Sequence, residues 1–516
     1  MKRFLSSPKN RMILYAAFFV GILALYLLRA TASGLWFDEA IEYYFSSTLR
    51  GPVPGARADY SMYRRILLTY QPPLYNWLMY LWLSVFDSEF WFRLAGILVT
   101  FLGGAGVYLA LREITDRDWA AAGTAVYLLA GGVSEYALEA GEYNLMLCMM
   151  CWTVFFYLHA VRKETGGAIL GFIAFACLAA YSQYGVVFLL VPMYGSVLLH
   201  FLKRKKHIRE LLIGSLAAGI AAALLLRFFL IGQMQVQGSA GVSHTPVFAY
   251  GVADVFMSLA RTLVFTFHSG KWIQLAVTIP AGLLLLFALP QKDRTLFRLL
   301  LLLMCSWVAY YFLTACSVYG YNGRWNPDQL GTANIGGRYS LMFAPLLAVT
   351  LVYGVYRFWK KRPEGSAKKW MAAALCLLIA YTAVGTWGIL TAPTKDDVRE
   401  ATQAWYDEKA FNAKTLVNQW DDPIFQFYLT HHPDYEDTYQ ENVVLSSWWA
   451  GEDPKQMEKK LSSLKLLDAE DFYYISKVSE DYEHHYRVFS RLMEEHGFTV
   501  KEVYKGDSAL VHVVKE

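Results

Sequence analysis

Acidic and cationic side chains flank the apolar runs of this 516-residue sequence at widely separated positions. Asp38, Glu39 and Glu42 follow the first apolar run, and Asp38 and Glu42 lie one turn apart on one face of a predicted helix. A carboxylate can act as a general base toward a hydroxyl or an amide. Arg338 opens a late apolar run, and its planar, permanently charged guanidinium group suits phosphate. A carboxylate and arginines beside apolar segments therefore indicate transfer from a lipid-linked phosphate donor.

Each of these residues also has a plainer interpretation. Acidic residues are favoured at helix N-termini by the helix dipole, and arginines anchor helices at the membrane interface. Charged groups beside apolar segments are nevertheless costly and mark functional sites by default. Further polar side chains are predicted at the same ends of the apolar runs: Arg93, Glu139, Glu142, Gln183, Tyr184, Arg227, His268, Lys271 and Tyr339.

The composition places these residues in a membrane protein. The chain is 56% hydrophobic and 17% charged, against about 25% charged in an average soluble chain. Residues 11–391 form a series of long apolar runs, whereas residues 395–516 are polar. All six cysteines fall within apolar runs. The sequence thus excludes a soluble enzyme, a disordered chain and a secreted disulfide scaffold, and a net charge of +4 gives no sign of nucleic-acid binding.

About eleven membrane spans are predicted from apolar runs of about 20 residues. They are residues 12–30, 91–112, 118–135, 142–161, 167–182, 184–202, 210–231, 272–290, 296–317, 338–359 and 370–391. Basic residues stay in the cytoplasm, and eleven crossings place all the basic connectors on that side. The N-terminus is then cytoplasmic, and the C-terminal domain lies outside the cytoplasmic membrane.

Residues 72–87 lie in the first outer loop, residues 31–90, and are apolar but short. A crossing here would move every later basic cluster to the outside, so we expect an amphipathic or re-entrant helix along the outer face. A true short span is the alternative.

The polar tail predicts a small α/β domain at residues 394–516, after a transmembrane domain at residues 1–393. Residues 443–448, 472–475, 500–504 and 509–514 are expected as strands, and residues 481–496 as a helix. His431 and His432 with Asp434, and His484 with His485, are interpreted as solvated surface rather than metal ligands.

Seven short motifs, in order along the chain, resemble those of one family. They are Leu35-Trp36-Phe37-Asp38-Glu39-Ala40, Gln71-Pro72-Pro73-Leu74-Tyr75-Asn76-Trp77, Ser88-Glu89-Phe90-Trp91-Phe92-Arg93-Leu94, Glu139-Ala140-Gly141-Glu142-Tyr143, Tyr181-Ser182-Gln183-Tyr184, Gly337-Arg338-Tyr339 and Lys395-Asp396-Asp397-Val398-Arg399-Glu400-Ala401. The sequence resembles GT-C glycosyltransferases, in the bacterial branch similar to protein O-mannosyltransferases and lipid A aminoarabinose transferase. That family also places a membrane-parallel helix in the first outer loop.

The resemblance implies an inverting transfer from a polyprenyl-phosphate sugar to an acceptor protein, glycan or lipid at the outer membrane face. Asp38 would be the catalytic base, and Glu139 would orient the acceptor, hold Arg338 or support Asp38. Arg338, Arg93 and Arg227 would bind the donor phosphate, with Arg64, Arg65, Arg261 and Arg324 as further candidates. The acceptor or sugar would contact Glu39, Gln71, Glu142, Tyr143, Tyr184 and Tyr339, and Glu39 is also expected to have a structural role.

The sequence departs from the family motifs at three positions. Gln71 replaces His or Lys, Gly141 replaces Arg, and Gln183 replaces His. No cofactor is predicted; a divalent metal is the alternative, with His268 as its candidate ligand.

Two other functions are compatible with a polytopic chain. A transporter or flippase of lipid-linked sugars should carry polar groups through the membrane midplane, and the charges here lie at one face. A membrane anchor for a polymer-binding domain would leave the acidic first loop without a function.

Overall fold

The computed structural model describes residues 7–47, 61–69, 71–237, 262, 266, 293–315, 338–361, 365, 369, 380, 382–391, 396–446, 454–478 and 483–516. The chain forms two compact units. The first, here called the helical unit, comprises Met1–Leu27, Arg64–Leu78 and Arg93–Ala392. The second, here called the α/β unit, comprises Leu28–Tyr63, Met79–Phe92 and Pro393–Glu516.

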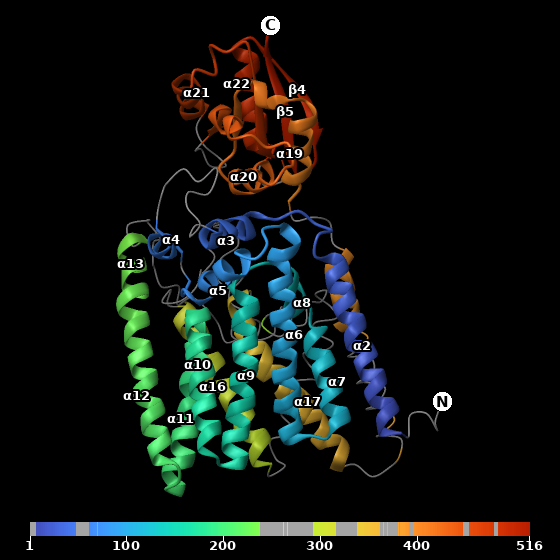
Figure 1. The fold of residues 1–516 in the computed structure, drawn as a ribbon, viewed down its shortest axis with the longest axis vertical. Helices are drawn as coiled ribbons and strands as arrows, with labels where there is room; N and C mark the ends of the chain where they lie inside the picture. The colour runs from blue at the N-terminus through green and yellow to red at the C-terminus, as the bar shows by residue number, and fades with distance from the viewer. Residues whose placement is uncertain are drawn as a thin grey trace. The chain divides into compact units, whose positions relative to one another are not determined.

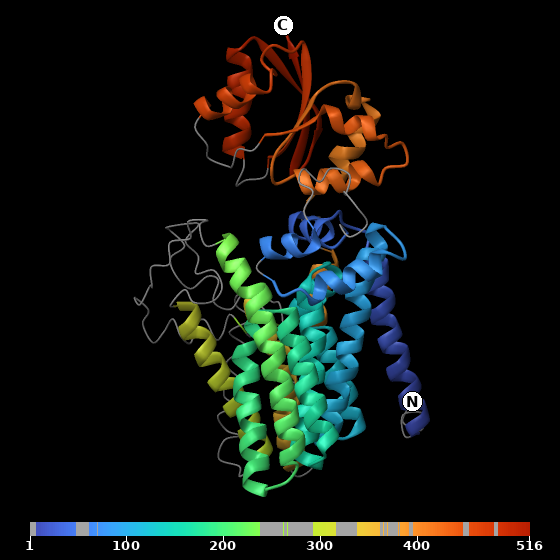
Figure 2. The same ribbon diagram turned by 60° about the vertical axis from the view of Figure 1, so that its left-hand side comes forward.

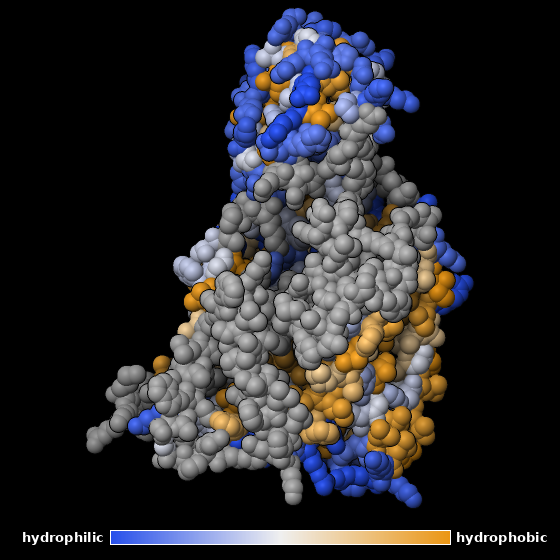
Figure 3. All heavy atoms as spheres, turned by 180° about the vertical axis from the view of Figure 1, so that it is seen from behind, coloured by the Kyte–Doolittle hydropathy of each residue, from blue (hydrophilic) through white to orange (hydrophobic). Residues whose placement is uncertain are grey.

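The helical unit is a bundle of long apolar helices that run side by side (Figures 1 and 2). Its described helices are α2 (Pro8–Arg29), α6 (Glu89–Ile114), α7 (Arg117–Leu128), α8 (Gly131–Leu138), α9 (Glu142–Lys163), α10 (Gly166–Ser182), α11 (Val187–Arg204), α12 (Ile208–Leu225), α13 (Ile231–Gln237), α16 (Arg294–Ala315) and α17 (Ala344–Lys361). Among the described residues, seven helices are long and apolar enough to cross a membrane, and α10 is a shorter apolar helix. Figure 3 shows hydrophobic side chains over the described part of the bundle. The chain is therefore a multi-pass membrane protein.

The predicted span at residues 118–135 is not one continuous helix. The helix α7 ends at Leu128, and α8 begins at Gly131. The Tyr26 hydroxyl donates to the Leu128 carbonyl at 2.6 Å, and the Thr386 hydroxyl donates to the Leu129 carbonyl. Side chains from α2 and from residues 382–391 thus satisfy the carbonyl groups that the break would leave unpaired. The predicted span at 272–290 and most of that at 370–391 lie outside the described residues.

The helices α6 and α9 pack closely through small residues. A Cβ atom at Gly103 would lie 3.1 Å from Cys148 Cα, and one at Gly106 would lie 3.1 Å from the Cys151 carbonyl carbon. Both cysteines are buried and free. Glycine at these positions lets the two backbones approach, as is common in membrane bundles. The cysteines therefore serve packing.

Residues 72–87 contain the ten-residue helix α5 (Leu74–Leu83). At about 1.5 Å per residue its length is about 15 Å, half of a bilayer's hydrocarbon core. This length agrees with the expectation that the segment does not cross. The first-loop helices are α3 (Phe37–Ser47) and α4 (Met62–Leu68).

A five-stranded sheet forms the centre of the C-terminal domain, with the order β2-β1-β3-β5-β4. Its strands are β1 (Thr415–Val417), β2 (Val443–Leu445), β3 (Asp471–Lys477), β4 (Phe498–Lys505) and β5 (Ser508–Lys515). The first three pair in parallel, whereas β5 pairs antiparallel with β3 and β4. The domain also contains α19 (Val398–Asp407), α20 (Asp422–Thr430), α21 (Pro454–Ser463) and α22 (Glu483–Glu495).

Helices cover both faces of this sheet (Figure 2). Alternation along β3 sends Phe472 and Tyr474 to the face covered by α21 and α22, and Tyr473 and Ile475 to the face covered by α19 and α20. The domain is the α/β fold that the tail predicts, and strands occur at all four expected places. The strands β3, β4 and β5 are longer than expected by a few residues, and β2 is shorter. The short strand β1 was not predicted.

His485 was expected to be solvated, and this prediction was wrong. Its side chain is 2% exposed, on the inner face of α22. Burial, with a smaller contribution from His484, lowers the pKa of His485 from 6.5 to about 4. The neutral imidazole is therefore the form that the fold accommodates.

A pH-dependent stability of this domain is expected from His485. Below pH 6.5 the unfolded chain binds a proton at this position, while the folded chain does so only near pH 4, so stability falls as the pH drops between these values. The loss through this group is ~3 kcal/mol. Thermal melting of the full-length protein between pH 7 and pH 4 measures it. His485→Gln should flatten the pH dependence and the exposed neighbour His484→Gln should not; equal pH dependences in both variants would refute the assignment.

Candidate active site

The acidic helix α3 carries Asp38 in its first turn, in the α/β unit. Asp38 is partly exposed, whereas Glu39 is 1% exposed and Glu42 is 5% exposed. Glu39 Oε2 accepts a hydrogen bond from the Trp36 backbone N–H at 3.3 Å. This contact ties the Glu39 side chain to the backbone just before the helix, which is a structural contribution. Asp38 is the more accessible of the three carboxylates.

In the helical unit, Glu139 and Glu142 lie on either side of the turn between α8 and α9. Glu139 follows the last residue of α8, and Glu142 is the first residue of α9. The Asn144 side-chain amide donates to the Glu139 carbonyl at 3.2 Å. A Cβ atom at Gly96 of α6 would lie 2.5 Å from Asn144 Nδ2, so α6 packs directly on this amide. The turn that positions both carboxylates is therefore fixed by a side chain and by an adjoining helix.

Arg338 is brought to the same turn by a short 3-10 helix, η4 (Arg338–Phe343), which contacts α8 and α9. Its guanidinium carbon lies 5.5 Å from the centroid of the Tyr339 ring. The guanidinium also interacts electrostatically with the hydroxyl groups of Tyr136 and Tyr143. The Tyr136 and Tyr143 rings pack against each other, with centroids 4.7 Å apart. Residues that are about 200 positions apart thus form one cluster of acids, tyrosines and an arginine.

A glutamine that the sequence did not indicate connects two further candidates. Gln233 of α13 is 3% exposed; its amide donates to the carbonyl groups of Gln71 at 2.7 Å and Ile66 at 2.9 Å. Its carbonyl oxygen accepts from the Tyr184 hydroxyl at 2.9 Å. Tyr184 lies in the 3-10 turn η2 (Tyr184–Val186), which also contacts η4. Gln233 therefore connects the segment that contains Ile66 and Gln71 to the turn η2, which contacts η4.

Loss of Gln233 should destabilise the helical unit. Gln233→Leu keeps the volume but removes three hydrogen bonds in a buried place, which costs about 1–3 kcal/mol. The melting temperature of the purified protein measures this effect. Gln235, two residues further along the same helix, is exposed, and Gln235→Leu is the matched control that should change little. Equal melting temperatures for the two variants would show that the Gln233 hydrogen bonds do not stabilise the fold.

The remaining cationic candidates have different surroundings. Arg93 of α6 is 3% exposed, one turn before Gly96, and Arg65 of α4 is 1% exposed. Arg227 is exposed, in the π-helical turn η3 (Leu226–Leu230), with its guanidinium 5.9 Å from the Phe228 ring. The structure thus buries Arg93 and Arg65 and leaves Arg227 at the surface.

No group of three or more His, Cys, Asp or Glu side chains suited to a metal ion occurs within the described part of the chain. His268, the metal-ligand candidate, lies outside the described residues, as do Lys271, Arg261 and Arg324.

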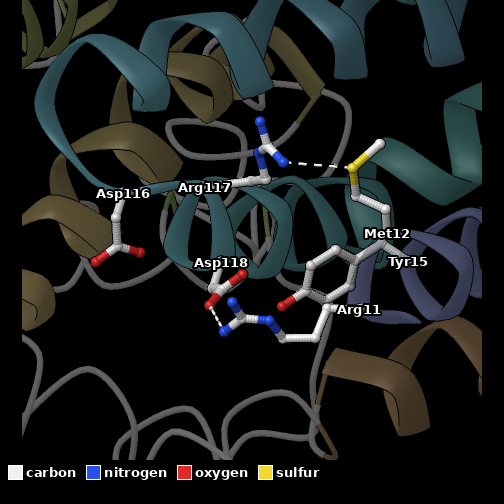
Figure 4. Close-up of a pocket in the computed structure, with 6 residues that line it drawn as sticks. All are labelled: Arg11, Met12, Tyr15, Asp116, Arg117 and Asp118. Carbon is white, nitrogen blue, oxygen red and sulfur yellow. Dashed lines mark hydrogen bonds and ion pairs between the residues drawn. The ribbon is translucent and has the colours of Figure 1, made fainter. Parts of the chain in front are cut away.

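A separate pocket of about 270 Å³ lies between α2 and α7, lined by Arg11, Met12, Tyr15, Asp116, Arg117 and Asp118 (Figure 4). The Arg11 guanidinium pairs with the Asp118 carboxylate at 2.6 Å, and Arg117 points to the Met12 sulfur. Both arginines thus already contact other lining residues. No candidate site residue lines this pocket.

Comparisons with known proteins agree with the fold. Residues 70–232 match the family described as dolichyl-phosphate-mannose-protein mannosyltransferase. The crystal structure of ArnT from Cupriavidus metallidurans in the apo state is similar over 98% of both chains, with a TM-score of 0.57 and 14% identity. The same figures hold for ArnT bound to undecaprenyl phosphate. The comparison with curated proteins found no match.

The chain therefore has a fold similar to that of ArnT, and its residues 70–232 resemble the mannosyltransferase family.

Proposed function

We propose that this protein transfers a sugar from a polyprenyl-phosphate donor to an acceptor hydroxyl or amine at the outer face of the cytoplasmic membrane. The observation that carries the proposal is the cluster of Arg338 with Glu139, Glu142 and Tyr143 at the ends of membrane helices. The ArnT structure that binds undecaprenyl phosphate has a similar fold over 98% of its chain, which makes an undecaprenyl-phosphate sugar the first donor to test.

Asp38 takes the proton of the acceptor in the proposed reaction. The acceptor oxygen or nitrogen forms a bond to the anomeric carbon as the bond from that carbon to the phosphate oxygen breaks. The electron pair leaves with the polyprenyl phosphate, and a single displacement inverts the anomeric configuration. Asp38 is suited to this role because its carboxylate is more accessible than those of Glu39 and Glu42.

The second requirement is stabilisation of the negative charge on the departing phosphate. A phosphate monoester has a second pKa of about 6, so it leaves without a general acid but benefits from a fixed positive charge. Arg338 supplies that charge, and its guanidinium can bond two phosphate oxygens at once. Arg93, Arg65 and Arg227 are further proposed phosphate contacts. Glu139 is proposed to support Asp38 or hold Arg338.

The remaining candidates are proposed to contact the acceptor or the sugar. Tyr143, Tyr184 and Tyr339 offer ring faces and hydroxyl groups for a sugar, while Gln71, Glu39 and Glu142 offer polar groups. The structure gives Tyr184 and the Gln71 backbone a shared partner in Gln233, which supports placing the two together.

A labelled donor distinguishes this function from its alternatives. Membrane vesicles that contain the protein are supplied with a radiolabelled undecaprenyl-phosphate sugar and an extract of envelope acceptors. Label that moves to an acceptor supports a glycosyltransferase. Label that crosses the membrane with its phosphate bond intact would identify a transporter, and label that is only bound would identify an anchor; either result refutes the proposal.

A further inference from the structure

Within the α/β unit, the residues just before Asp38 rest on the C-terminal domain. The Leu35 backbone N–H donates to the Tyr428 hydroxyl oxygen at 2.6 Å. The Phe37 ring packs on the Trp420 ring, with centroids 4.6 Å apart. A Cβ atom at Gly34 would lie 3.3 Å from both the Tyr428 hydroxyl and the Asp396 carbonyl oxygen, so a larger residue here would crowd the C-terminal domain. The chain that leads into α3 is thus held by a hydrogen bond and by an aromatic contact.

The residues just after Asp38 rest on the same domain. Ala40 is 1% exposed and belongs to the buried cluster of α19 and α20 that includes Val398 and Leu429. One turn further, the Tyr43 ring meets the His431 ring at 5.4 Å, and the Tyr43 hydroxyl lies 3.3 Å from His431 Nε2. The contacts therefore bracket Asp38 on both sides along the chain.

His431 also connects α3 to the segment before the second span. Its Nδ1 lies 2.7 Å from the Phe427 carbonyl, which can only accept, so Nδ1 carries a proton. Its Nε2 lies 3.4 Å from the Asp87 carboxylate, which in turn accepts from the Tyr43 hydroxyl at 3.0 Å. Tyr43, Asp87 and His431 thus form a closed polar triangle from three distant parts of the sequence.

Arg399 of α19 makes a second connection of the same kind. Its guanidinium donates to the Thr31 carbonyl at 3.1 Å and lies 3.8 Å from the Glu89 carboxylate. The start of the first outer loop and the start of α6 are therefore both bound by the opening helix of the C-terminal domain.

We infer that the C-terminal domain holds the acidic helix α3 in place, and that Trp420, Tyr428 and His431 are positioning residues for Asp38. The positioning role rests on the proposed function. A base must be held close to the acceptor proton, and a misplacement of about 1 Å can lower a rate by about 10²-fold. The three side chains do not need to touch substrate for this effect. They contact the Leu35 backbone and the Phe37 ring before Asp38, and the Tyr43 ring after it.

Two adjacent histidines provide a matched test. His431 contacts Tyr43 and Asp87, whereas His432 stacks on Tyr406 within the domain, with centroids 3.7 Å apart. In the full-length protein, His431→Ala should lower kcat for sugar transfer about tenfold or more with little change in KM for the donor, and His432→Ala should leave kcat within about twofold. Trp420→Ala should act like His431→Ala, and Trp420→Phe should restore most of the rate. Equal losses in both histidine variants, or no loss in either, would overturn the inference.

A second measurement does not depend on activity. Amide hydrogen exchange of residues 35–47, followed by mass spectrometry, should be faster in His431→Ala and Trp420→Ala than in the wild type, and unchanged in His432→Ala. Unchanged exchange in the first two variants would show that the C-terminal domain does not hold α3 in place. Faster exchange with an unchanged kcat would overturn the positioning role. If the wild type transfers no sugar, the proposed function fails, but the exchange result still shows whether the C-terminal domain holds α3 in place.

Discussion

Replacing Asp38 by asparagine is expected to abolish sugar transfer while the protein stays folded. Asparagine has nearly the same shape but cannot accept the acceptor proton, and a general base contributes about 10²–10⁴-fold to a rate. Initial rates of the purified protein with a labelled polyprenyl-phosphate sugar measure the effect. Because Asp38 lies at the partly exposed start of α3, the melting temperature should change little.

Asp118→Asn is the matched control for this prediction. The Asp118 carboxylate pairs with Arg11 in the pocket between α2 and α7, and a partly exposed ion pair of this kind contributes about 0–1 kcal/mol. The control should transfer sugar at close to the wild-type rate. An Asp38→Asn variant that retains most of its turnover would remove Asp38 from the role of base.

The second large effect is expected at Arg338. Arg338→Gln removes the charge that the proposal places at the departing phosphate, and loss of one such electrostatic group costs about 10²–10³-fold in rate. The rate of Arg338→Lys should fall between those of the wild type and Arg338→Gln, because lysine keeps the charge but not the planar fork. Values of kcat and of KM for the donor measure both variants.

Arg117→Gln serves as the control, since Arg117 lies against the Met12 sulfur and away from the site cluster. It should leave kcat within about twofold. Because Arg338 also interacts with Tyr136 and Tyr143, the melting temperature of each Arg338 variant shows whether the helical unit is intact. A folded Arg338→Gln variant with wild-type kinetics would exclude Arg338 from phosphate binding.

Much of the fold could be predicted because its helices and strands have recognisable patterns of hydrophobic residues in the sequence. The long apolar runs predict the spans, and the alternation of residues 472–475 and 509–514 predicts β3 and β5. The strand β1 was missed because three residues are too few to show a period, and its partners are about 30 and 60 residues away. The break at Leu129 was missed because its carbonyl groups are satisfied by Tyr26 and Thr386, which are remote in sequence.

The candidate site was predictable in part for a similar reason. Charged residues beside apolar runs stand out, so Asp38, Glu139 and Arg338 could be named from the sequence. Gln233 and Asn144 carry no charge, and one amide within an apolar helix gives no such signal. His431 was interpreted as solvated surface because nothing in the local sequence indicates that Tyr43 and Asp87 contact it.

The most direct test of the central claim is an experimental structure of the full-length protein with bound undecaprenyl phosphate. The account predicts density for the phosphate within hydrogen-bonding distance of the Arg338 guanidinium, with the Asp38 carboxylate facing the space where the sugar would lie. Phosphate density in the pocket of Arg11 and Arg117, or Asp38 and Arg338 at opposite membrane faces, would contradict it.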